Sequence, residues 1–121
     1  MWLRRLSGRQ RQGQLWEQRA LAFLQSKGMT LVEANFTCKS GEIDLILRDH
    51  GELVFVEVRQ RASSLHGGAA ASITPAKQRR VIRAAQTYLL RFAPTPPCRI
   101  DVVAIDGQQL EWLPNAIQAM P

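Results

Sequence analysis

The most constraining feature of the sequence is a pair of acidic residues inside its most apolar hairpin. Residues 41–46 read Gly-Glu-Ile-Asp-Leu-Ile and residues 53–59 read Leu-Val-Phe-Val-Glu-Val-Arg, so Asp44 and Glu57 interrupt two runs of strand-forming residues. Burying an ionised carboxylate is unfavourable unless a cation or hydrogen bonds compensate for the lost water. The pattern therefore predicts a shared partner for the two acids, such as a metal ion.

A two-residue turn at residues 50–51 (His-Gly) sets the predicted register of this hairpin. The turn places Asp44 opposite Glu57 and Glu42 opposite Arg59, with Cβ atoms about 4.5–5.5 Å apart. Carboxylates at this separation repel each other, which raises one pKa unless a divalent cation lies between them. A shift of one residue would move Asp44 to the other face of the sheet, so the prediction depends on the turn.

Length and patterning predict one α/β domain, because 121 residues suffice for a single core. We expect a basic flexible arm over residues 1–12, the domain over 13–115 and a tail over 116–121. The order of the expected elements is αβββαββ with a helical crossover, which gives a mixed central sheet flanked by helices. The predicted helices cover residues 13–27 and a segment that starts at Thr74 and ends before Pro94. The predicted strands cover residues 30–36, 42–47, 53–60, 99–105 and 108–113. A turn is predicted at Asp106-Gly107 and a loop over residues 62–72.

The segments Gly41–Asp44 and Phe55–Arg59 resemble the YraN-like family of uncharacterised bacterial proteins. By its fold that family belongs to the PD-(D/E)xK nuclease superfamily, which includes archaeal Holliday-junction resolvases. The likeness covers most of the chain, from the first helix through Asn35 and the hairpin to the Lys77 helix and the 99–103 strand. It implies a restriction-endonuclease-like fold with an αβββαβ core. It also implies a metal-dependent endonuclease that hydrolyses phosphodiester bonds of DNA, branched or junction DNA included.

The resemblance implies a role for each matching residue. The motif aspartate of the superfamily maps onto Asp44 and the glutamate of its ExK element onto Glu57, so these two would bind Mg²⁺ or Mn²⁺. The motif lysine maps onto Arg59, a guanidinium that stays charged and suits phosphate or transition-state oxygens better than proton transfer. Glu17 lies at the edge of the buried stripe of the first helix and has two readings. It is either a salt-bridged or solvated margin residue, or a further catalytic acid near the metal.

Positive charge points to a polyanionic partner. The chain has 16 Lys and Arg against 10 Asp and Glu, for a net charge of +6. Several cations crowd the start of the second helix, where the helix dipole already favours anions. They form a predicted track for a nucleic-acid backbone, and the alternative is a solvated basic face. The predicted nucleic-acid-binding residues are Arg61, Lys77, Arg79, Arg80 and Arg83.

Two other functions remain open because the motif lysine is replaced. One is a binding module that kept the fold and lost the chemistry, and the other is an assembly factor that docks on an RNA–protein complex. In the nuclease reading the partner is DNA, and junction resolvases act as symmetric pairs, which allows a homodimer. We expect Asp101 to be a paired structural acid, and the alternative is an acid that supports the metal ligands. Cys38 and Cys98 have no metal-ligand spacing, and no apolar run follows the basic start, so we expect reduced thiols, no membrane segment and a cytoplasmic location.

Overall fold

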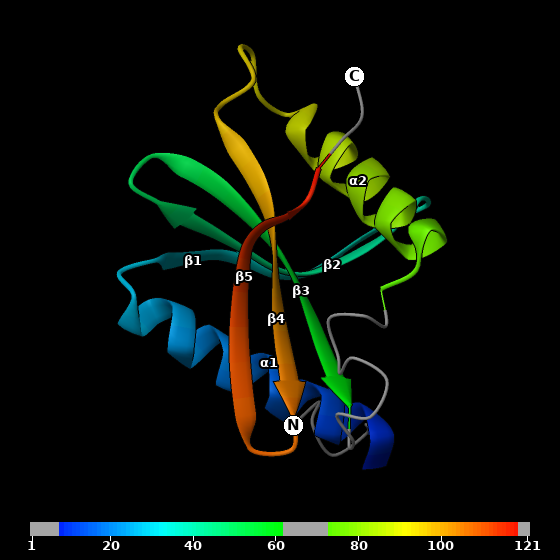
Figure 1. Ribbon diagram of the computed structural model, residues 1–121. Helices are drawn as coiled ribbons and strands as arrows, with labels where there is room; N and C mark the ends of the chain where they lie inside the picture. The colour runs from blue at the N-terminus through cyan, green and yellow to red at the C-terminus, as the bar shows by residue number, and fades with distance from the viewer. Residues whose placement is uncertain (1–7, 62–72, 119–121) are drawn as a thin grey trace.

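The fold is a five-stranded mixed sheet with one helix on each face (Figure 1). The computed structural model describes residues 8–61 and 73–118, with side chains over 14–60 and 73–118; the predicted loop over 62–72 and the first seven residues of the predicted arm lie outside the described residues. The elements, in chain order, are α1 (Gly8–Ser26), β1 (Thr30–Cys38), β2 (Gly41–Asp49), β3 (Glu52–Arg61), α2 (Pro75–Leu89), β4 (Cys98–Asp106) and β5 (Gln109–Ile117).

The strands lie in the order β1-β2-β3-β4-β5, so each strand pairs with its neighbour in sequence. All neighbours are antiparallel except β3 and β4, which are parallel and are connected through α2. Parallel neighbours require a crossover connection, and a helix is the usual one. The predicted α/β fold with an αβββαβ-type core and a mixed central sheet is therefore confirmed.

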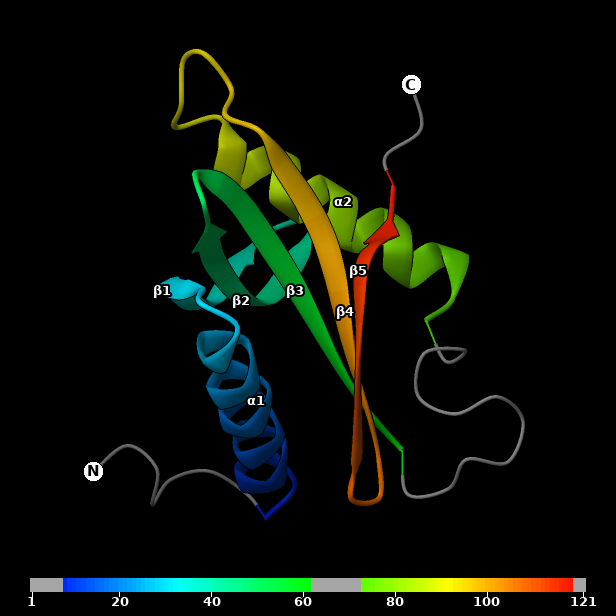
Figure 2. The same ribbon diagram turned by 60° about the vertical axis from the view of Figure 1, so that its left-hand side comes forward.

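The core has two halves, one on each face of the sheet. Figure 2 shows α1 and α2 on opposite sides of the central strands. Strand β3 contributes alternate residues to both halves, because successive side chains of a strand point to opposite faces. Leu53 and Phe55 pack on the α2 side, and Val54 and Val56 pack on the α1 side. This arrangement explains the unbroken apolar run that predicted a central, doubly covered strand.

The hairpin turn at His50 and Gly51 is confirmed, with φ values of 51° and 87°. The predicted register holds from Asp49 and Glu52 down to Leu45 and Val56. There the ladder ends, so the predicted pairs Asp44–Glu57 and Glu42–Arg59 are not ladder partners. The reason is local: the backbone N–H of Val58 donates to the Asp44 side chain, Oδ2, at 2.8 Å. A carboxylate thus takes the place of a backbone acceptor.

Several boundaries differ from the predicted ones. Helix α1 begins at Gly8, inside the predicted arm, because glutamine and arginine are good helix formers. Strand β5 continues to Ile117, which is 3% exposed and belongs to the core, so it reaches into the predicted tail. The β4–β5 turn is Gly107-Gln108, since Asp106 still pairs with Gln109. Neither helix in residues 8–61 and 73–118 has the length and apolarity needed to cross a membrane.

The start of α2 forms as its sequence predicts. Thr74 is the N-cap, and its hydroxyl oxygen accepts the backbone N–H of Lys77 at 3.1 Å. Pro75 follows at the first helical position, where its missing N–H has no consequence. The buried side of the helix packs on the sheet through Val81, Ala85 and Tyr88. The cap therefore fixes where α2 begins, and with it the position of Lys77 in the first turn of the helix.

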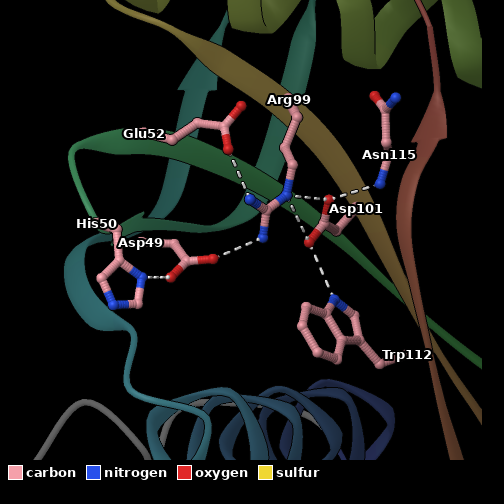
Figure 3. A network of polar contacts seen from close by, with 7 residues as sticks. All are labelled: Asp49, His50, Glu52, Arg99, Asp101, Trp112 and Asn115. Carbon is pink, nitrogen blue, oxygen red and sulfur yellow. Dashed lines mark hydrogen bonds and ion pairs between the residues drawn. The ribbon is translucent and has the colours of Figure 1, made fainter.

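Arg99 of β4 links three carboxylates at the other end of the hairpin (Figure 3). Its Nη1 donates to Glu52 Oε1 at 2.7 Å, its Nη2 donates to Asp49 Oδ2 at 3.0 Å, and its Nε donates to Asp101 Oδ1 at 3.0 Å. Burial lowers the pKa of Arg99, but the hydrogen bonds to these acids outweigh it and raise the pKa overall. The hydrogen bond from Arg99 also lowers the pKa of Asp49.

Asp101 is the buried centre of this network. Its side chain is 0% exposed, and besides Arg99 it accepts the indole N–H of Trp112 at 2.9 Å and the backbone N–H of Asn115 at 2.8 Å. Asn115 has a positive φ of 52°, a conformation that asparagine tolerates better than most residues. These contacts are those of a paired structural acid, which tie β4 to β5 and to the β2–β3 turn.

Candidate functional site

Three acids from three different elements meet where the β2–β3 ladder ends. Asp44 lies between the other two, with side-chain hydrogen bonds both to Glu57 of β3 and to Glu17 of α1. Carboxyl groups this close to one another disfavour each other's ionised form. We call the three acids Glu17, Asp44 and Glu57 the acidic cluster.

Each helix covers one side of the acidic cluster. Glu57 has the same strand parity as Phe55 and so faces α2, whereas Glu17 comes from α1 on the other side of the sheet. Asp44 can contact both Glu57 and Glu17 because the pairing of β2 with β3 ends at Leu45, next to Asp44. Glu17 thus lies near the other two acids, while its role as a further catalytic acid stays a prediction. Its side chain also hydrogen-bonds to Asn35, a β1 residue with a positive φ of 57°.

Burial makes all three acids weaker than usual. Burial and the charge of Asp44 raise the pKa of Glu57 from 4.5 to about 8. Burial and the charges of Asp44 and Glu42 raise the pKa of Glu17 from 4.5 to about 7. Burial also raises the pKa of Asp44, although the hydrogen bond from Val58 opposes the change. A cation that bound to a cluster with such pKa values would have to displace protons.

Two cations act on the acidic cluster. The Nζ atom of Lys77 lies 3.9 Å from Glu57 Oε2, and the Lys77 side chain is 25% exposed. Both Lys77 and Arg59 lower the pKa of Glu57, and Lys77 does so more strongly. The structure therefore brings a lysine to the acids from α2, whereas the sequence placed only Arg59 there. The sequence predicts Lys77 only as part of the basic track.

The structure separates the remaining predicted cations. Arg80 lies about 60° around α2 from Lys77 and lines a cavity with it, whereas Arg79 lies about 160° away. Arg83 is exposed about 60° beyond Arg80. Arg61 ends β3, and its side chain lies outside the described part of the chain. Around α2 the cations follow one another in the order Lys77, Arg80, Arg83 and Arg79, with Arg79 only about 40° beyond Arg83, so they form a broad band in which Lys77 and Arg80 are nearest the acids.

The residues present fit a divalent cation that binds oxygen. One oxygen of Glu17, Oε1, is buried and has no hydrogen-bond partner among the described residues. Asp44 and Glu57 are adjacent, and Asp44 is held in place by Val58. Within the described residues, no group of three His, Cys, Asp or Glu side chains is placed to hold a metal ion. Mg²⁺ and Mn²⁺ can bind through one or two carboxylates and several waters, and Asp44 and Glu57 are the carboxylates that would supply them.

Sequence reasoning missed two members of the site. The sequence points to Asn35 only through the family likeness, and its contact with Glu17 follows a register shift in β1 between Leu31 and Glu33. The sequence predicts Lys77 to bind phosphate and does not place it beside the acids. The sequence signal that bears on Lys77 is the Thr74 cap, which fixes the start of α2. The placement of Lys77 beside Glu57 depends on the whole crossover between β3 and β4.

Comparisons with known proteins agree on one family. Residues 16–105 match the uncharacterised protein family UPF0102. The chain is 54% identical to a UPF0102 protein of Herminiimonas arsenicoxydans over 113 aligned residues. The alignment covers 93% of this chain and 91% of that protein. The chain is 53% identical over 118 residues to one from Janthinobacterium sp. (strain Marseille), which covers 98% and 96%. It is 61% identical over 107 residues to one from Cupriavidus metallidurans, which covers 88% and 80%.

Proposed function

The chain belongs to the uncharacterised protein family UPF0102, and we propose that it is a divalent-metal-dependent nuclease of the PD-(D/E)xK type that acts on DNA. The observation that carries the proposal is the convergence of Glu17, Asp44 and Glu57 with Lys77 beside them. Paired carboxylates with a nearby lysine are a constellation suited to phosphodiester hydrolysis.

Each residue has a distinct role in this proposal. Asp44 and Glu57 hold Mg²⁺ or Mn²⁺, and Glu17 accepts a proton or hydrogen-bonds to a water at the edge of the site. A bound divalent ion supplies polarisation of the scissile phosphate and a lowered pKa for the attacking water. Lys77 and Arg59 stabilise the negative charge that develops on the phosphate oxygens.

The position of Lys77 favours the enzyme over a binding module without chemistry. Replacement of the motif lysine by Arg59 was the main support for an inactive module. Lys77 supplies an ammonium group 3.9 Å from the carboxylate of Glu57, so a lysine is available from another element. An ammonium is a compact point charge, unlike the planar guanidinium of Arg59.

The test is a cleavage assay with the pure protein. Branched, duplex and single-stranded DNA are incubated with and without Mn²⁺, next to single-stranded and duplex RNA of the same sequence. Products that require Mn²⁺ support the proposal, and the preferred substrate identifies the nucleic acid. A protein that leaves every substrate intact in Mn²⁺ contradicts it.

We expect Mn²⁺ to stabilise the protein more at about pH 8 than at about pH 6. The pKa values of Glu17 and Glu57, about 7 and about 8, mean that an ion must displace protons at the lower pH. Affinity should rise about tenfold per pH unit for each proton displaced. Without metal the sign is opposite: raised carboxyl pKa values stabilise the fold below the unfolded-state pKa, and this stability is lost as pH rises through about 7 to 8.

The measurement is the Tm by differential scanning fluorimetry across this pH range, with and without Mn²⁺. The Asp44→Asn variant is the control and should show little shift in Tm. A shift in Tm that is equal at all pH values, or that persists in Asp44→Asn, would place the ion elsewhere on the protein.

Lys77→Met should lower kcat about 100-fold, because a charge aimed at the reacting phosphate is lost from a partly buried site. Arg79→Ala is the matched control, since Arg79 is on the same helix but projects about 160° away from Lys77. Steady-state cleavage kinetics measure both variants. Equal loss in the two variants would mean that Lys77 acts only through the net charge of α2.

A further inference from the structure

A cavity of about 250 Å³ lies beside the acidic cluster, between α2 and the β1–β2 hairpin. Lys77 connects the cavity to the acidic cluster, because it lines the cavity and its Nζ atom lies 3.9 Å from Glu57 Oε2. A ligand in this cavity therefore sits next to the candidate metal site. The lining residues are Thr37, Cys38, Gly41, Glu42, Lys77, Arg80 and Val81.

The close approach of hairpin and helix depends on Gly41. A Cβ atom at this position would lie 3.4 Å from both the Cβ and the carbonyl oxygen of Arg80. A separation of 3.4 Å is at the close limit of ordinary van der Waals contact, and one of the two contacts is to backbone, which cannot move aside easily. The glycine thus lets the hairpin approach Arg80 and so forms one wall of the cavity.

The charges that line the cavity favour an anion. Lys77 and Arg80 contribute two positive charges, and Glu42 contributes one negative charge. No described acid forms an ion pair with Arg80, so its guanidinium is available to a ligand. A guanidinium binds phosphate through two parallel hydrogen bonds, which adds geometric selectivity to the attraction of charge.

We propose that this cavity is a phosphate subsite, which holds the phosphate group next to the one that is cleaved. This inference rests on the proposed function, because a ligand with successive phosphates can occupy the cavity and the acidic cluster together. The phosphate is either an internal one of the strand or a terminal 5′-phosphate. In the second case the subsite recognises a strand end and directs cleavage to a fixed distance from it.

Cys38 and Cys98 provide a matched pair of reporters. Cys38 is partly exposed in the cavity next to Arg80, whereas Cys98 is exposed on the other side of α2, where it lines a different cavity with Ile82 and Gln86. The test measures the rate of N-ethylmaleimide labelling of Cys38 in the Cys98→Ser variant. Labelling of Cys98 in Cys38→Ser is the control. No metal is added, so the result does not depend on cleavage.

The probes are inorganic phosphate and two single-stranded DNA 12-mers, one with a 5′-phosphate and one with a 5′-hydroxyl. At ten times its Kd, a probe in the cavity should slow Cys38 labelling about tenfold and leave Cys98 unchanged. Protection by both 12-mers identifies an internal phosphate, and protection only by the phosphorylated one identifies a terminal phosphate. Unchanged Cys38 labelling with every probe overturns the proposal.

Arg80→Ala should abolish the protection, whereas Arg79→Ala should keep it, since only Arg80 lines the cavity. Equal loss in both variants would overturn the subsite in favour of attraction by overall charge. A protein that shows the Arg80-dependent protection but does not cleave with Mn²⁺ would contradict the nuclease and leave the subsite. A protein that cleaves without protection of Cys38 would contradict the subsite alone.

Discussion

Asp44→Asn is expected to reduce metal-dependent cleavage by about 100-fold or more, since changes that merely support a metal ligand already cost up to about that factor. Asp44 is the central acid of the cluster and contacts both Glu17 and Glu57. Asparagine keeps an oxygen that can accept the backbone N–H of Val58, so the local structure should remain. Loss of one charge from a buried acidic cluster should leave the Tm at or above that of the wild type.

The control for this variant is Glu111→Gln, which changes an exposed acid on β5, the edge strand two places from β3. Cleavage by the control should match the wild type. The same preparations are compared by Tm, by Mn²⁺-induced shift in Tm and by product formation over time. If Asp44→Asn cleaves DNA within a few-fold of the wild-type rate, Asp44 is not a metal ligand and the acidic cluster has another role.

Arg99→Ala is expected to lower the free energy of unfolding by about 3 kcal/mol, the lower end of the range for removal of one partner from a buried ion pair. Three carboxylates lose their common cation, and the fully buried Asp101 keeps only the donors of Trp112 and Asn115. Asp49 and Glu52 are also directly opposed across the hairpin, so their repulsion is no longer neutralised.

Urea unfolding measures this effect, with Arg91→Ala as the matched control. Arg91 pairs with Glu33 at 3.7 Å on the surface and lies over the Tyr88 ring, so its loss should cost about 1 kcal/mol or less. If Arg99→Ala does not fold, Arg99→Lys should fold with an intermediate loss, since one ammonium cannot reach three carboxylates. Equal losses for Arg99→Ala and Arg91→Ala would mean that the network contributes no more than a surface ion pair.

The parts of the fold that follow from local signals could be predicted from the sequence. The His50-Gly51 turn fixed the hairpin register, and the Thr74-Pro75 pair fixed the start of α2. The unbroken apolar run of β3 indicated a strand covered on both faces. Each of these depends on backbone preferences within a few residues.

The rest of the candidate site depends on long-range geometry. The ladder ends at Leu45 because the Asp44 side chain takes the N–H of Val58, a choice that alternation of residues does not reveal. The position of Lys77 over Glu57 requires the complete crossover between β3 and β4. The link from Arg99 to the hairpin turn has only an indirect sequence signal, the two opposed acids Asp49 and Glu52.

The parallel pairing of β3 and β4 has a consequence for synthesis of the protein. The acids at positions 17, 44 and 57 leave the ribosome before Lys77 does, and β3 gains its second neighbour only when β4 has been made. Contacts between residues so distant in sequence form late in folding. A growing chain therefore carries the three acids without Lys77 beside them until the crossover and β4 have been made.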